Sequence, residues 1–223
     1  IIQATGGQLL SGKPDQVVTS ISTDTRTVKA GDFYIPLKGT NFDGHDFIDD
    51  AIAKGVMGIL VGAGKPRPGE ETSPLHVIQV QDTLKALGDI AHAWRTQFDI
   101  PLIGITGSNG KTTTKEMLSS VLSVKGEVLK TLGNLNNLIG LPLTLMNLTR
   151  DQKFAVIEMG MNAPGEITRL TEIASPTIGL ITNVGRAHLA GFDDLSGVAK
   201  AKGELFLGLS KTALAIKNQD DDW

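Results

Sequence analysis

The stretch Leu102-Ile-Gly-Ile-Thr-Gly-Ser-Asn-Gly-Lys-Thr-Thr-Thr-Lys115 combines the end of a strand, a loop and the start of a helix in one short segment. The apolar run from Pro101 to Ile105 predicts a buried strand, and Thr106 to Gly110 is too rich in glycine and small polar residues to continue it. The residues that follow carry apolar side chains at helical spacing, namely Met117, Leu118, Val121 and Leu122. They predict a helix over 112–125.

A strand, a glycine-rich loop and a helix start in this order form a cradle for phosphate groups. Gly107 and Gly110 let the backbone curl so that its N–H groups converge on an anion, and the helix N-terminus adds partial positive charge. In such loops the lysine reaches the outer phosphates and the following hydroxyl holds Mg²⁺. We therefore predict a nucleotide-binding loop made of Gly107, Ser108, Asn109, Gly110, Lys111, Thr112 and Thr113.

The match to the longer phosphate-loop pattern is incomplete. G-x-x-x-x-G-K-[ST] requires a glycine at position 105, where this sequence has Ile105. The alternative interpretation is a tight β–α turn with an incidental lysine. Because Gly-Lys-Thr directly after a strand and a loop is a specific combination, the sequence favours nucleotide binding.

Composition narrows the class of protein. The chain has 223 residues, a formal net charge of −3 and no cysteine, and its pI is near 5.8. The absence of a broad basic field argues against a nucleic-acid partner, and any divalent ion must be held by oxygen or imidazole ligands. No apolar stretch approaches the roughly 20 residues of a membrane span, and no signal sequence is visible. We expect a cytoplasmic protein without a membrane span.

The predicted elements divide the chain into two segments. The first, 1–98, is rich in loops, with strands near 17–22, 32–36, 57–61 and 75–80 and helices over 46–54 and 83–98. Asp82 caps the second of these helices, and a polar, proline-rich loop covers 65–74. Asp99-Ile-Pro101 is typical of a joint between domains, so we expect a small α/β domain over 1–98.

The second segment, 99–223, alternates regularly between strands and helices. We expect strands over 102–106, 127–131, 154–159, 177–184 and 213–217 and helices over 112–125, 139–147, 165–173 and 195–209. Alternation with nearly continuous apolar strands predicts a parallel sheet covered by helices on both faces. The sequence stops soon after its last strand, which leads us to expect an incomplete domain.

Polar residues that follow these strands are candidates for metal binding, because ligands bind beyond the carboxyl ends of parallel strands. Glu158 ends one apolar strand and His188 follows the next. The alternatives are a solvated acid and a structural histidine. Lys200 and Lys202 lie on the next helix, where charged residues ordinarily form a solvated face. The remaining histidines, His45, His76 and His92, we expect to be structural.

Three loops carry clustered polar residues of ambiguous role. Asn134, Asn136 and Asn137 lie in Leu132-Gly-Asn-Leu-Asn-Asn-Leu-Ile-Gly-Leu-Pro142 and can donate to substrate oxygens, although asparagine is also an ordinary turn residue. The same ambiguity applies to Thr23-Asp-Thr-Arg26 and Gly39-Thr-Asn-Phe-Asp-Gly-His45 in the first segment.

Taken together, these motifs resemble the Mur ligases of cell-wall synthesis, specifically the MurF type, over essentially the whole chain. In the second segment the resemblance rests on Thr106-Gly-Ser-Asn-Gly-Lys-Thr-Thr113, Gly133 to Pro142, Glu158-Met-Gly160 with Gly165-Glu-Ile167, Asn183 to His188, Ala199 to Phe206 and Ala215 to Trp223. In the first it rests on Ser22 to Arg26 and Ala30 to His45. This family uses a shorter loop, which accounts for Ile105.

The resemblance implies a uridine-nucleotide domain over 1–98 and an ATP-binding domain over 99–223. Gly107 to Thr113 would hold ATP, Thr112 and Glu158 would share one Mg²⁺, and His188 with a carbamylated Lys202 would serve a second. The implied catalytic residues are Lys111, Glu158, His188 and Lys202. The implied substrate contacts are Thr25, Arg26, Thr40, Asn41, Phe42, Asn134, Asn136 and Asn137.

The implied reaction is ATP-dependent addition of D-alanyl-D-alanine to UDP-N-acetylmuramoyl-tripeptide through an acyl phosphate, in the synthesis of peptidoglycan precursors. The family pattern also implies a monomer and a third, dipeptide-binding domain that closes over ATP. Because that domain has no counterpart in the 223 residues, we expect this chain alone to be inactive.

Three alternatives remain open at this point. The first is a MurE-type ligase that adds the third amino acid, against which the loop 133–142 argues. A second is a GTPase, although the sequence lacks an Asn-Lys-x-Asp guanine motif after a strand. A non-catalytic module that binds the UDP-linked substrate or the nucleotide is the third.

Overall fold

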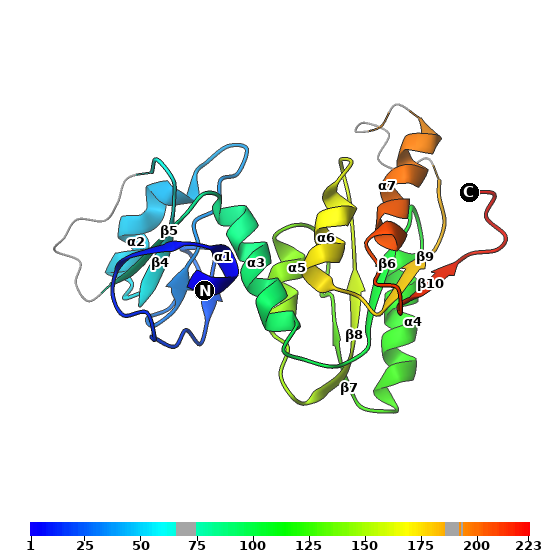
Figure 1. Ribbon diagram of the computed structural model, residues 1–223, viewed down its shortest axis with the longest axis horizontal. Coiled ribbons are helices and arrows are strands. Elements are labelled where there is room, and N and C mark those ends of the chain that lie inside the picture. Colours follow the sequence, from blue (N-terminus) through cyan, green and yellow to red (C-terminus); the bar gives the residue numbers. More distant parts are fainter. Residues whose placement is uncertain (66–74, 186–191, 193) are drawn as a thin grey trace. The chain divides into compact units, whose positions relative to one another are not determined.

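The computed structural model describes residues 1–65, 75–185, 192 and 194–223. It divides into two compact units, Ile1–Ile90 and Ala91–Trp223, and the boundary falls inside helix α3 (Thr83–Arg95) (Figure 1). Each unit has its own five-stranded sheet, which confirms the expected α/β class. The proline-rich loop expected over 65–74 lies outside the described residues except for Lys65. Among the described residues no helix is long and apolar enough to cross a membrane.

The sheet of the first unit is mixed. Its strand order is β1 (Gln8–Ser11), β5 (His76–Val80), β4 (Gly58–Gly62), β3 (Phe33–Tyr34) and β2 (Ile21–Ser22). Strand β1 runs antiparallel to β5, and the other neighbouring strands are parallel. The helices are α1 (Ile2–Thr5), the 3-10 helix η1 (Gly44–Phe47) and α2 (Ile48–Ala53). Buried side chains of α2 and the parallel strands form the core of this unit.

The first unit differs from the expected elements in two places. No element was expected before residue 17, but α1 and β1 lie there; Gln8-Leu-Leu-Ser11 lacks the alternation that identifies a strand. The helix expected over 46–54 is confirmed as α2 over Ile48–Ala53, but the 3-10 helix η1 precedes it and covers the first residues of the expected range. The Asp43 carboxylate accepts a hydrogen bond from the His45 N–H and caps this tighter turn.

The sheet of the second unit is entirely parallel, as predicted. Its order is β10 (Leu214–Lys217), β9 (Ile178–Ile181), β6 (Leu102–Thr106), β8 (Gln152–Glu158) and β7 (Glu127–Lys130). The connecting helices are α4 (Lys111–Ser123), α5 (Gly140–Leu145), α6 (Glu166–Ala174) and α7 (Leu195–Leu207). Because all strands are parallel, their carboxyl ends meet at one edge of the sheet.

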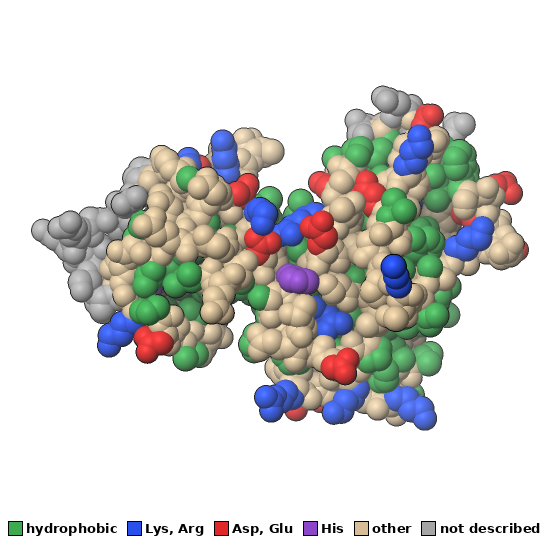
Figure 2. Space-filling view, in the orientation of Figure 1, with side chains coloured by type: hydrophobic (Ala, Val, Ile, Leu, Met, Phe, Trp, Pro, Cys, Tyr) green, Lys and Arg blue, Asp and Glu red, His purple; other side chains and the backbone are tan. Residues whose placement is uncertain are grey.

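Helices cover the two faces of this sheet unequally. Leu102, Ala155 and Ile157 pack with α5, α6 and α7 on one face, whereas Ile103, Ile105 and Val156 pack against Leu118 and Leu122 of α4 on the other. Helices therefore lie on both faces of the sheet, as predicted, although on the α4 side Leu214 and Ile216 of the edge strand β10 remain 62% and 45% exposed. Figure 2 shows hydrophobic side chains gathered on the surface over α4.

Strand β9 is shorter than the sequence indicated. The apolar run predicted a strand over 177–184, but β9 ends at Ile181. Thr182 to Gly185 leave the sheet because their polar groups bond to the glycine-rich loop after β6. Hydrogen bonds to the glycine-rich loop therefore take the place of strand pairing at this edge of the sheet.

A buried arginine closes the hydrophobic core of the second unit. Arg95 is 5% exposed, and its guanidinium donates to the backbone carbonyls of Ala174, Phe98 and Ile100. Burial lowers the pKa of Arg95, and the charge of Asp99 opposes this shift. The side chain thus satisfies the C-terminus of α6 and the segment that enters β6.

Replacing Arg95 with Met should destabilise the protein by about 2–4 kcal/mol, because one buried and two partly buried carbonyls would lose a charged donor. Urea denaturation measures this, and Arg150→Met, at an exposed residue, is the control. A loss below about 0.5 kcal/mol at Arg95, equal to that expected of a surface substitution, would contradict the account.

Candidate functional site

The candidate site lies at the carboxyl edge of the parallel sheet. The chain leaves the central strand β6 through α4 toward β7 on one side, and it later returns across β6 to reach β9 on the other side. Ligands bind at such a switch point in open parallel sheets. The loop Gly107 to Gly110, between β6 and α4, lies at this point.

Two glycines in this loop are required by its backbone. Gly107 has a φ of 150°, and a Cβ there would lie 1.9 Å from the Thr182 hydroxyl oxygen. Gly110 has a φ of 78° and caps α4, accepting a hydrogen bond from the Thr114 N–H. The first N–H groups of α4 have no partner within the helix and point at the space beyond its N-terminus, where an anion binds favourably.

The glycine-rich loop is fixed to the segment after β9 by a dense set of hydrogen bonds. The Asn183 carboxamide accepts from the Asn109 N–H at 2.9 Å and donates to its carbonyl at 3.2 Å. Thr182 donates to the same carbonyl at 2.6 Å. The Ser108 hydroxyl donates to the Gly185 carbonyl and accepts from the Gly185 N–H. These contacts fix the conformation of the loop, so that it is preorganised for a ligand.

The side chains at the start of α4 and the end of β8 meet directly. The Thr112 hydroxyl donates to Glu158 Oε2 at 2.9 Å, and Asn136 Nδ2 donates to Oε1 at 2.9 Å. Glu158 is only 3% exposed, whereas Thr112 is exposed. A hydroxyl and a carboxylate that converge beside a helix N-terminus are the oxygen ligands that Mg²⁺ prefers, so these residues fit a metal–nucleotide complex.

Lys111 folds back over the loop that it follows. Its Nζ donates to the Gly107 carbonyl at 2.7 Å. Burial lowers the pKa of Lys111, and the nearby Glu158 carboxylate opposes this shift. The ammonium is therefore held over the loop within reach of a phosphate that replaces the carbonyl as its partner.

Lys202 is buried in α7 rather than solvated. It is 1% exposed, and burial together with repulsion from Lys111 lowers its pKa to about 8. The expectation from charge pattern alone, a solvated lysine, was therefore wrong. Lys200, two residues earlier, is exposed as expected. A lysine with this pKa is partly a neutral amine near physiological pH, which is the form that reacts with CO₂.

His188 lies outside the described residues. Within the described ranges, no group of three or more His, Asp or Glu side chains is gathered where it would hold a metal ion. The predicted assignment of His188 to a second metal ion stays a prediction.

The three asparagines of the loop before α5 take different positions. Asn136 contacts Glu158, and its carbonyl accepts from the Gly160 N–H at 2.8 Å. Asn137 Oδ1 accepts from the N–H groups of Ile139 and Gly140 at the start of α5. Asn134 is exposed. Two of the three side chains thus have structural partners, and the substrate contacts predicted for all three stay predictions.

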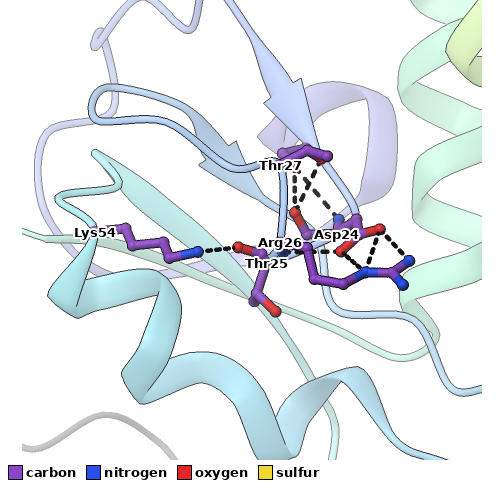
Figure 3. A network of polar contacts seen from close by, with 6 residues as sticks. Asp24, Thr25, Arg26, Thr27 and Lys54 are labelled. Carbon is purple, nitrogen blue, oxygen red and sulfur yellow. Dashed lines mark hydrogen bonds and ion pairs between the residues drawn. The ribbon is translucent and has the colours of Figure 1, made fainter.

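In the first unit, the turn after β2 forms a compact polar network (Figure 3). The Arg26 guanidinium binds both carboxylate oxygens of Asp24, and these hydrogen bonds are the main reason that the pKa of Asp24 falls to about 2. Lys54 Nζ donates to the Thr25 carbonyl at 2.6 Å. Because the Arg26 side chain is 86% exposed, it is accessible to an anionic ligand.

The turn after β3 lies at the same carboxyl edge of the parallel strands. Thr40, Asn41 and Phe42 are exposed at its tip, and Phe42 is 64% exposed. His45 anchors its base, since Nδ1 lies 2.6 Å from Asp43 Oδ1 and Nε2 accepts from the Gly62 N–H at 3.1 Å. This contact confirms the structural role expected of His45.

The comparisons with known proteins cover both units. Residues 17–95 match the model described as "Mur ligase family, catalytic domain", and residues 105–223 match the one described as "Mur ligase middle domain".

The chain belongs to the Mur ligase family. A UDP-N-acetylmuramoyl-tripeptide–D-alanyl-D-alanine ligase of Buchnera aphidicola is 46% identical over 209 residues, which are 92% of this chain and 44% of the relative. The chain thus spans about half the length of the curated relatives it matches.

Solved Mur ligase structures agree with this fold. A crystal structure of MurF from Acinetobacter baumannii has a TM-score of 0.91 and 38% identity, covering 99% of this chain and 48% of that one. MurF from Thermotoga maritima in complex with ADP has a TM-score of 0.84 and 33% identity, covering 93% and 47%.

Sequence reasoning missed several residues that shape the site of this Mur ligase. Lys115, Thr131 and Asp221 were not singled out, although Asp221 accepts from the Val184 N–H at 2.7 Å, Lys115 is 2% exposed and Thr131 is fully buried. Lys115 did carry a signal, because it lies at i and Leu118, Ser119 and Leu122 lie at i+3, i+4 and i+7 on the face of α4 turned to the sheet. Thr131 and Asp221 carried none.

Replacing Lys202 with Met should stabilise the CO₂-free protein by about 3 kcal/mol at pH 7, since each tenfold change in proton affinity is worth about 1.4 kcal/mol. The pKa of Lys202 is about 8 in the folded state against 10.5 ordinarily, so the unfolded state binds more protons between these values and wild-type stability rises with pH there. The advantage of Lys202→Met should therefore fade from pH 8 to 10.5.

Denaturation midpoints at several pH values measure this difference, with Lys200→Met as the exposed control. A gain that is the same at pH 7 and pH 10.5 would show that Lys202 is not buried as an ammonium ion.

Proposed function

We propose that this chain contains the substrate-binding and ATP-binding units of an amide ligase that adds D-alanyl-D-alanine to UDP-N-acetylmuramoyl-tripeptide. Residues 1–98 would bind the UDP-linked substrate and residues 99–223 would bind ATP. The proposal includes a cytoplasmic, monomeric enzyme that acts in peptidoglycan synthesis and thereby in cell shape and division.

The observation that carries the proposal is the hydrogen bond of Thr112 with Glu158 at the N-terminus of α4, directly after the glycine-rich loop over which Lys111 is held. A bare β–α turn needs neither a buried carboxylate nor a lysine held over the loop. The ligase names of relatives such as the 46% identical Buchnera protein, and the ADP bound to MurF from Thermotoga maritima, support ATP as the nucleotide.

The chemistry assigned to these residues is charge stabilisation. Thr112 and Glu158 would hold Mg²⁺, and the ion would supply positive charge for the phosphoryl oxygens. The N–H groups of Gly110 to Thr113 bind phosphate oxygens, and Lys111 stabilises the charge that builds up as the γ-phosphoryl group moves to the tripeptide carboxylate. The acyl phosphate is then attacked by the dipeptide amine, and phosphate leaves.

Lys202 and His188 are assigned to a second Mg²⁺. The neutral Lys202 amine would attack the carbon of CO₂, forming an N–C bond and losing a proton, so that a cation becomes a carbamate oxygen ligand. Its burial and its pKa of about 8 support this step. His188 is included on the family motif alone.

The first unit is assigned to the uridine diphosphate. Thr25 and Arg26 follow β2, and Thr40, Asn41 and Phe42 follow β3, so parallel strands present both turns at one edge. Arg26 offers a guanidinium for the diphosphate, and the exposed Phe42 ring offers an apolar surface for the base.

The choice of D-alanyl-D-alanine over a single amino acid rests on the relatives' names and on the loop with Asn134, Asn136 and Asn137. Phosphate release by the native gene product, measured with UDP-N-acetylmuramoyl-tripeptide and D-alanyl-D-alanine, tests it. If phosphate release instead requires UDP-N-acetylmuramoyl-dipeptide together with diaminopimelate or lysine, the chain would be assigned to the MurE type.

Lys111→Ala should lower the turnover of the native gene product by at least about 10²-fold, since it removes a charge that acts in the transition state. The circular dichroism spectrum should be unchanged. Lys125→Ala, at an exposed lysine just beyond α4, is the matched control. Near-normal turnover of Lys111→Ala would remove this residue from the mechanism.

A further inference from the structure

A second lysine of α4 is buried without any role in the proposed chemistry. Lys115 lies three residues after Thr112, is 2% exposed, and donates from Nζ to the Thr131 carbonyl at 2.7 Å. Glu116 Oε1 lies 3.1 Å from the same Nζ, but Glu116 is itself 48% exposed and also pairs with Lys130. Burying an ammonium group is costly, so its partners are informative, and of these two the Thr131 carbonyl belongs to the buried residue.

That partner, Thr131, joins two strands at the edge where the site lies. It follows β7 and is fully buried, and its N–H donates to the Val156 carbonyl. Its hydroxyl accepts from the backbone N–H of Glu158 at 2.9 Å. Thr131 therefore fixes the height of Glu158 at the end of β8 while its own carbonyl is held by Lys115.

These contacts close a ring around the proposed metal site. Lys115 bonds to Thr131, Thr131 bonds to the Glu158 backbone, and the Glu158 carboxylate accepts from Thr112, which lies on the same helix as Lys115. Asn136 holds the other carboxylate oxygen. Within this ring, the separation of the two oxygen ligands depends on how β7 is tied to α4.

We infer that Lys115 is a positioning residue that sets the spacing of Thr112 and Glu158, and through it the affinity of the nucleotide site for the divalent cation. The inference rests on the proposed function, because it takes Thr112 and Glu158 as the ligands of Mg²⁺. Partners that orient metal ligands ordinarily change metal affinity by about 10–100-fold when they are removed.

The test compares Lys115→Met with Lys130→Met in the 223-residue chain. Both lysines pair with Glu116, but only Lys115 reaches Thr131. Calorimetry measures ADP affinity with and without Mg²⁺. Lys115→Met should lower the Mg²⁺-dependent part of the affinity by about 10–100-fold and leave metal-free ADP binding within about 3-fold. Lys130→Met should match the wild type in both.

A second pair of variants decides the matter if Lys115→Met does not fold. Thr131→Val keeps the shape and the carbonyl but removes the hydroxyl acceptor of the Glu158 N–H, whereas Thr131→Ser retains it. Thr131→Val should lose the Mg²⁺-dependent part of the ADP affinity selectively, as Lys115→Met does. Thr131→Ser should bind ADP like the wild type, both with and without Mg²⁺.

The outcomes separate this inference from the function on which it rests. Wild-type chain that binds no Mg²⁺–ADP would contradict both. Wild-type chain that binds it, with folded Lys115→Met or Thr131→Val variants equal to wild type, would overturn the inference alone. Equal losses with and without Mg²⁺ would also overturn it, because they indicate a purely structural lysine.

Discussion

The hydrogen bond between Thr112 and Glu158 joins the start of α4 to the end of β8, and the proposed chemistry depends on this contact within the second unit. Thr112 belongs to the first turn of α4 and Glu158 to the end of β8, so the bond requires the parallel order in which β6 and β8 are neighbours. A parallel sheet brings the carboxyl ends of its strands to one edge, and the helix N-terminus provides partial positive charge there. The fold thus creates an anion-binding edge, and these two side chains add oxygen ligands for a cation.

The same geometric rule organises the first unit. Its parallel strands β2, β3 and β4 present the Asp24–Arg26 turn, the turn before His45 and the Gly62 N–H at one edge. Burial raises the pKa of Tyr34 to about 12, and the nearby carboxylates of Asp24, Asp43 and Asp50 add smaller contributions in the same direction. The mixed sheet of the first unit and the parallel sheet of the second therefore both present polar loops at the carboxyl ends of parallel strands. The loops of the first unit carry a guanidinium and an aromatic ring, and those of the second form the proposed phosphate cradle.

Local patterns predicted the order of elements in the second unit, because periodicity and glycine content are properties of neighbouring residues. They did not predict which apolar side chains would be buried. Met117 and Val121 share helical spacing with Leu118 and Leu122, yet they are 65% and 68% exposed. Contacts such as Asn183 with Asn109 join residues 74 positions apart, so they depend on the tertiary fold and leave no local trace. Lys202 was misjudged for the same reason, since its burial is decided by what packs on α7.

The account depends most on the claim that the loop after β6 holds the polyphosphate of ATP. A crystal structure with Mg²⁺ and a non-hydrolysable ATP analogue tests this directly. It should show the β- and γ-phosphates within hydrogen-bond distance of the N–H groups of Gly110 to Thr113, Lys111 moved from the Gly107 carbonyl to a phosphate oxygen, and a metal ion between Thr112 and Glu158. Triphosphate bound elsewhere, or a loop that stays closed on its own side chains at saturating analogue, would contradict it.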